Sequence, residues 1–163
     1  MALWRLYYHI VWATKEREQS ITAELERPLY GYILGKATAL ECVVHAIGGM
    51  GDHVHLVLSA PPKLSIAELV QNLKGSSAHY ANSRPSAPDM RFAWQRGYGV
   101  FSLGSRQLDA AVEYVRGHKA HHGQGDAVVL LERDSDVDDG PANWRGGEAL
   151  AGISPVHETL PDA

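Results

Sequence analysis

The feature that most constrains the fold is a pair of short β-rich runs with helix-forming sequence on both sides. The runs cover residues 41–47 and 53–59, and the five residues between them, GGMGD, include three glycines. A glycine-rich connection of this length is typical of a β-hairpin. The pair therefore predicts two adjacent antiparallel strands joined by a turn over residues 48–52.

Helical and strand patterns alternate around this hairpin. Residues 22–39 and 65–82 repeat apolar side chains at helical spacing, and each begins near a serine or threonine that can cap the helix. β-Branched and aromatic side chains predict a buried strand over 6–14 and a last strand, or a strand pair interrupted by glycines, over 92–103.

A third helical pattern covers residues 105–122, with Ser105 as its predicted cap. The resulting order, β-α-β-β-α-β-α, matches a split β-α-β arrangement. We therefore predict an α+β, ferredoxin-like fold with an antiparallel sheet, helices on one face and an added C-terminal helix.

A change in charge divides the chain after His122. Residues 1–122 hold 13 basic and 10 acidic side chains, a net charge of +3, whereas residues 123–163 hold 2 basic and 9 acidic side chains, a net charge of −7. The second segment is also rich in Gly, Asp and Pro. The sequence predicts a folded domain over 1–122 and a flexible acidic tail over 123–163.

Composition excludes several classes of protein. No run approaches the roughly 20 apolar residues of a membrane span, and Arg5 and His9 interrupt the apolar stretch that a signal peptide needs. We therefore expect a cytoplasmic protein with no membrane partner. The single cysteine, Cys42, excludes an intrachain disulfide and a cysteine-based zinc cluster, and its apolar surroundings predict a core position.

Two histidines, His53 and His55, lie two residues apart in the second run of the hairpin. Side chains alternate along a strand, so both imidazoles are expected on one face, where they could bind one metal ion. The same pattern also describes two histidines that merely line a half-exposed strand.

Tyr114 and His118 are four residues apart in the last helical pattern, so a helix would place both on one face. A tyrosine hydroxyl would then lie beside an imidazole ligand. The alternative is that the Tyr114 ring packs against the sheet and His118 is a solvated surface residue.

Two further segments, residues 71–77 and 94–102, contain aromatic, cationic and polar side chains. Such side chains suit contacts with the bases and phosphates of single-stranded DNA. The same segments are also compatible with a core strand and an ordinary exposed helix face. The candidate DNA-binding residues are Lys74, Ser76, Trp94, Gln95, Arg96 and Tyr98.

Five segments, taken in order, resemble one protein family. They are HIVWATKERE, the H-V-H triplet after G-D, QNLKGSSA, WQRGYGVFS and YVRGHKAHH. Together they resemble the small single-tyrosine HUH transposases, the TnpA-type enzymes of bacterial insertion sequences, over residues 5–122. The order of five motifs is far more specific than any one of them.

The resemblance implies a dimeric enzyme that recognises DNA hairpins and cleaves and rejoins single-stranded DNA with a divalent metal, Mg²⁺ or Mn²⁺. By correspondence, His53 and His55 match the metal ligands and Tyr114 matches the nucleophile. His118 stands where the family commonly has a glutamine that completes the metal site. Three imidazoles would favour Mn²⁺ or Zn²⁺ over Mg²⁺ more than the family pattern does.

Other functions remain open on the sequence alone. One is a domesticated HUH nuclease that processes chromosomal repeat hairpins without mobilising its own gene. A second is a hairpin-binding protein without catalytic activity, which the presence of His53, His55 and Tyr114 argues against. A metal-dependent hydrolase of small molecules is more distant, because it would need no helical tyrosine.

Overall fold

The computed structural model describes residues 2–85 and 91–120, so the predicted acidic tail over 123–163 lies outside the described residues. The elements follow in this order: β1 (Tyr7–Ala13), a 3-10 helix η1 (Lys15–Arg17), α1 (Ala23–Ala39), β2 (Val43–Met50), β3 (His53–Ser59), α2 (Ile66–Ser83), β4 (Gly99–Leu103) and α3 (Leu108–Arg116).

The strands form one four-stranded sheet in the order β2-β3-β1-β4, and every neighbouring pair is antiparallel. Helix α1 connects β1 to β2, yet β3 lies between these two strands in the sheet. This is the predicted split β-α-β arrangement, and the predicted α+β, ferredoxin-like fold is confirmed.

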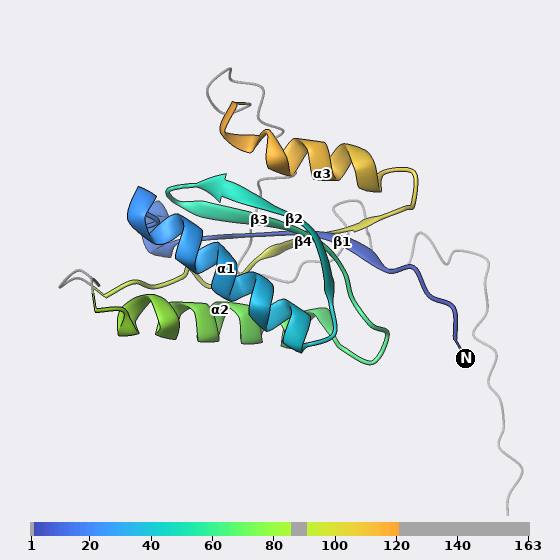
Figure 1. The fold of residues 1–163 in the computed structure, drawn as a ribbon, viewed down its shortest axis with the longest axis horizontal. Coiled ribbons are helices and arrows are strands. Elements are labelled where there is room, and N and C mark those ends of the chain that lie inside the picture. The colour runs from blue at the N-terminus through green and yellow to red at the C-terminus, as the bar shows by residue number, and fades with distance from the viewer. Residues whose placement is uncertain (1, 86–90, 121–163) are drawn as a thin grey trace, which may run out of the picture.

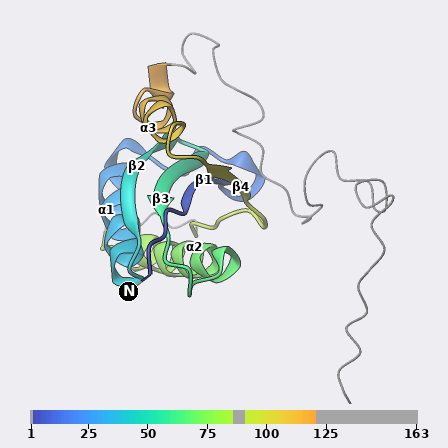
Figure 2. The same cartoon turned by 90° about the vertical axis from the view of Figure 1, so that its right-hand side faces the viewer.

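Helices cover both faces of the sheet. Figures 1 and 2 show α1 and α2 against one face and α3 against the opposite face. Strand β3 is in the interior of the sheet and has helices over both faces, so all seven of its residues are buried. Among the described helices, the added C-terminal helix α3 alone covers the second face of the sheet.

Alternation along the strands sorts side chains between two hydrophobic clusters. Val54, Leu56 and Leu58 of β3 belong to the main core with α1 and α2, whereas Val57 packs with Val115 of α3. Cys42 also lies in the main core, as predicted, and its burial raises the pKa of its thiol.

The predicted hairpin turn is too long. Strand β2 runs through Gly48 and Gly49 to Met50, so only residues 51 and 52 connect it to β3. Gly48 pairs with His55 across the ladder, and a Cβ on Gly48 would lie 2.4 Å from the carbonyl oxygen of Val115. Gly48 therefore allows α3 to approach the sheet closely, whereas the sequence pattern places this glycine in the turn.

Two other boundaries also differ from the prediction. In the 92–103 segment only β4 forms an extended strand, and Trp94 makes a single bridge to Thr14. Helix α3 begins after Gln107, because residues 105–107 form a turn, and Gln107 Oε1 accepts a hydrogen bond from Gly104 N at 2.8 Å. Ser105 is therefore not the cap.

The two long helices begin as predicted. Thr22 Oγ1 accepts a hydrogen bond from Leu25 N, and Ser65 Oγ accepts one from Glu68 N. Helix α1 continues through Pro28. Among residues 2–85 and 91–120, no helix has the length and apolar character that crossing a membrane requires.

The main core predicts a sharp contrast between two leucines. Leu29 of α1 is completely buried, whereas Leu3 is 88% exposed. We expect Leu29→Ala to lower the free energy of unfolding by about 2–5 kcal/mol, because it leaves a cavity under the sheet, and Leu3→Ala to leave it nearly unchanged. Urea unfolding of both variants measures the difference, and equal effects would contradict this core.

Candidate metal centre and nucleophile

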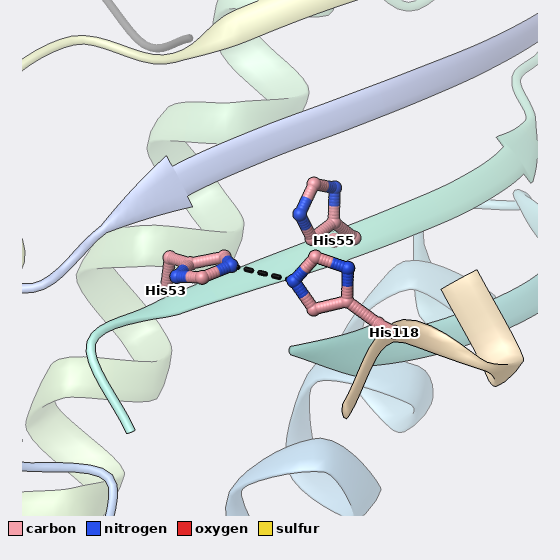
Figure 3. A group of neighbouring side chains, drawn as sticks. All are labelled: His53, His55 and His118. Carbon is pink, nitrogen blue, oxygen red and sulfur yellow. Dashed lines mark hydrogen bonds between the residues drawn. The ribbon is translucent and has the colours of Figure 1, made fainter. Parts of the chain in front are cut away.

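Three histidines from two elements gather on the α3 side of the sheet. His53 and His55 come from β3 and His118 follows α3, and their candidate ligand nitrogens all lie within 4.8 Å of one another. Figure 3 shows the three rings together, with His53 Nε2 2.7 Å from His118 Nε2. All three side chains are buried.

The strand and the helix bring these rings together for different reasons. His53 and His55 share a face of β3 because strand side chains alternate. A turn at Gly117 ends α3, and His118 begins the next helical residues. The close contact of α3 with Gly48 then brings His118 over the sheet.

Lys119 attaches the chain beside His118 to two other elements. Its Nζ donates a hydrogen bond to the carbonyl oxygen of Gly49 in β2 at 3.0 Å and forms an ion pair with Glu26 of α1. The contact with Gly49 lies at the end of β2 nearest the turn to β3. Lys119 therefore reinforces the position of His118.

The Nδ1 atom of His53 is held by a hydrogen bond to a carboxylate. His53 Nδ1 donates to Asp52 Oδ1 at 2.6 Å, and Arg17 Nε lies 3.4 Å from Asp52 Oδ2. Glu16 and Arg17 both have a φ of 55°, a left-handed conformation that non-glycine residues seldom adopt. A strained segment thus brings a cation to the residue that orients His53.

The Nδ1 atom of His55 also contacts a neighbouring side chain. His55 Nδ1 lies 2.7 Å from His9 Nε2, and His9 is completely buried in β1. Each β3 histidine therefore uses Nδ1 for a neighbour within the protein. Metal-bound histidines are commonly held in this way by their second nitrogen.

The donor set suits a divalent transition metal. Three imidazole nitrogens are common ligands for zinc, and they leave coordination positions for water or a substrate oxygen. The carboxylate beside His53 adds the usual outer partner of such a ligand. His53, His55 and His118 could therefore hold one divalent ion.

Tyr114 of α3 is half-buried beside this cluster in the same chain. Its ring centroid lies 5.6 Å from that of His118, 5.9 Å from that of His55 and 6.1 Å from that of His9. The predicted nucleophile and the predicted ligands are thus brought together by the fold.

Other tyrosines occupy different surroundings. The ring of Tyr7 lies 5.8 Å from that of His45, and Tyr8 and Tyr98 pack against the main core. Burial and the neighbouring Glu26 carboxylate raise the pKa of Tyr30, which keeps that hydroxyl protonated. In the described part of the chain, Tyr114 is the tyrosine whose ring lies beside two of the candidate ligands, His55 and His118.

Most candidate DNA-binding side chains make contacts within the protein. Lys74 Nζ donates to the carbonyl oxygens of Gln95 and Gly97 at 2.6 and 2.7 Å, and Trp94 Nε1 donates to Ser77 Oγ at 2.9 Å. These bonds attach the 94–98 segment to α2.

The remaining candidates differ in their contacts with the protein and in their exposure to solvent. Gln95 Oε1 accepts a hydrogen bond from Glu16 N at 2.9 Å, and Ser76 Oγ donates to the Asn72 carbonyl within α2. Tyr98 packs against the main core, whereas Arg96 is exposed. Contact of these side chains with DNA stays a prediction.

The sequence patterns considered above predict no role for His9, Asp52, Arg17 or Lys119. Two signals were available for the first two. Alternation places His9 on one face of its strand, and Asp52 immediately precedes the first candidate ligand, His53. The contacts of Arg17 and Lys119 join segments far apart in sequence, so no local pattern indicates them.

A family model described as "Transposase IS200 like" matches residues 2–118. The chain belongs to this family. The match covers the whole sheet, the three helices, Tyr114 and the three histidines.

Two curated relatives have similar sequences. The ISDra2 transposase TnpA of Deinococcus radiodurans is 37% identical over 76 residues, which are 47% of this chain and 54% of that protein. The transposase for insertion sequence element IS200 of Salmonella typhimurium is 33% identical over 108 residues, which are 62% of this chain and 69% of that protein. The first alignment spans only about half of the relative.

Two solved structures have a similar fold. A crystal structure of a Deinococcus radiodurans R1 protein assigned as a transposase has a TM-score of 0.55 and 25% identity, over 78% of this chain and 95% of that one. A REP-associated tyrosine transposase bound to a REP hairpin has a TM-score of 0.58 and 13% identity, over 76% and 75% of the two chains. The second likeness concerns the fold alone.

The contact between Asp52 and His53 predicts a loss of metal affinity in Asp52→Ala. Without the carboxylate, the His53 ring loses its fixed orientation, so we expect Zn²⁺ affinity to fall about 10- to 100-fold. Asp109→Ala, at an exposed site on α3, is the matched control and should bind as the unmodified protein does. Titration calorimetry measures both, and unchanged affinity in Asp52→Ala would contradict the assignment.

Proposed function

We propose that this chain is a transposase that cleaves and rejoins single-stranded DNA at hairpin-marked element ends. Tyr114 acts as the nucleophile, and His53, His55 and His118 hold a divalent ion. The observation that carries the proposal is the position of the Tyr114 ring beside His55 and His118 in one chain. Family membership supports the same reaction class.

The chemistry needs help from a cation because an ordinary tyrosine hydroxyl, with a pKa near 10, is a weak nucleophile at neutral pH. A divalent ion, when bound, polarises the scissile phosphate and stabilises its developing negative charge. His53, His55 and His118 would hold this ion beside Tyr114. The short distances from the Tyr114 ring to the rings of His55 and His118 support this arrangement, because a nucleophile already held near the ion would need little reorganisation when DNA binds.

Tyr114 forms the new bond to the scissile phosphate. Its oxygen attacks the scissile phosphorus, the bond from phosphorus to the 3′ oxygen breaks, and the phenolic proton is balanced by the proton gained at the released 3′-hydroxyl. The product is a 5′-phosphotyrosine. Because the phosphodiester bond energy is retained, a second 3′-hydroxyl can reverse the step and join new ends without ATP.

Three imidazole ligands bear on the choice of metal. Nitrogen donors favour Mn²⁺ or Zn²⁺, whereas Mg²⁺ prefers oxygen donors. We therefore propose Mn²⁺ ahead of Mg²⁺ for the reaction, with Zn²⁺ as a tight-binding probe of the site. The partners proposed here are single-stranded DNA hairpins and a second copy of the chain.

Tyr114→Phe tests the nucleophile directly. The variant loses only a hydroxyl, so we expect normal folding and hairpin binding but no covalent adduct. The assay incubates the protein with Mn²⁺ and labelled single-stranded DNA from the flanks of its own gene, followed by denaturing electrophoresis. Tyr7→Phe is the matched control, because its ring lies beside His45 and should be dispensable for the adduct.

Two results would contradict the proposal. Adduct formation by Tyr114→Phe would move the nucleophile to another residue. Hairpin binding without any adduct from the unmodified protein, across Mg²⁺ and Mn²⁺, would instead indicate a hairpin-binding protein without catalytic activity.

A further inference from the structure

His9 is a buried histidine that the proposed reaction does not use. It lies in β1 with no exposed surface, and its Nε2 is 2.7 Å from Nδ1 of His55. Its ring centroid is 6.2 Å from that of Phe101 and 6.1 Å from that of Tyr114. One side chain thus touches a candidate ligand and packs near the candidate nucleophile.

The register of the sheet explains this contact. His9 pairs with Val57 of β3, and Val11 pairs with His55, so His9 and His55 are diagonal neighbours on one face. That face is the one covered by α3, where Val57 packs against Val115. The contact is therefore built into the pairing of the two central strands.

We propose that His9 is a positioning residue that fixes the ring and the tautomer of His55 for metal binding. The inference rests on the proposed function. An imidazole binds a metal through a nitrogen that carries no proton, so a ligating Nε2 leaves the proton of neutral His55 on Nδ1. That N–H donates to His9 Nε2, and His9 must carry its own proton on Nδ1.

His9 is not a fourth ligand on this geometry. Its Nε2 is hydrogen-bonded to Nδ1 of His55. Within the described residues, the cluster of potential ligands consists of His53, His55 and His118. His9 does for His55 what Asp52 does for His53. The difference is that a carboxylate can only accept, whereas an imidazole must be held in one tautomer to do so.

The first experiment measures Zn²⁺ affinity of the full-length protein by titration calorimetry. His9→Phe keeps an aromatic ring against Phe101 and Tyr114 but removes the acceptor, so we expect affinity to fall about 10- to 100-fold. His9→Gln restores an acceptor oxygen and should recover most of that loss. His45→Phe is the control, because His45 forms a hydrogen bond with Ser59 and not with a candidate metal ligand.

The second experiment needs no variant. Nitrogen-15 NMR of histidine-labelled, zinc-loaded protein should show His9 and His55 each protonated on Nδ1. Thermal unfolding of the metal-free variants reports whether each one folds. If His9→Phe does not fold, His9→Gln and the NMR spectrum decide the question.

The outcomes separate this inference from the proposed function. Wild-type affinity in His9→Phe, or a proton on His9 Nε2 in the zinc-loaded protein, overturns the role of His9 and leaves the metal site intact. Failure of the unmodified protein to bind Zn²⁺ overturns both. Weaker binding in His9→Phe, recovered in His9→Gln, supports the assignment.

Discussion

The site depends on the position of β3 between two strands and two layers of helices. Hydrogen-bonded neighbours on both sides fix its register, and helices cover both of its faces. Alternation then divides its side chains: Val54 and Leu56 enter the main core, while His53 and His55 face α3. A shift of one residue would exchange the two sets, so core packing and the candidate metal site require the same register.

The second requirement is the close approach of α3. Because Gly48 has no side chain, the backbone of α3 at Val115 can lie directly over β2. Tyr114 and His118 lie on either side of that contact in the sequence, and Lys119 attaches the end of the segment to Gly49. One close backbone contact thus positions both the proposed nucleophile and the third candidate ligand.

Much of this could be predicted from the sequence because it depends on local periodicity. The shared face of His53 and His55, the four-residue spacing of Tyr114 and His118, and the order of elements all follow from strand and helix repeats. The glycines before β3 could not be interpreted in the same way. A glycine marks either a turn or a close approach, and only the packing of α3 on Gly48 distinguishes the two.

The central claim is that one divalent ion lies between three histidines beside Tyr114. Anomalous X-ray scattering from crystals of the zinc-loaded protein tests it most directly. We expect one strong peak about 2.0–2.1 Å from a nitrogen of each of His53, His55 and His118. A zinc peak at another place, or one with no nitrogen of His118 within bonding distance, would contradict this claim.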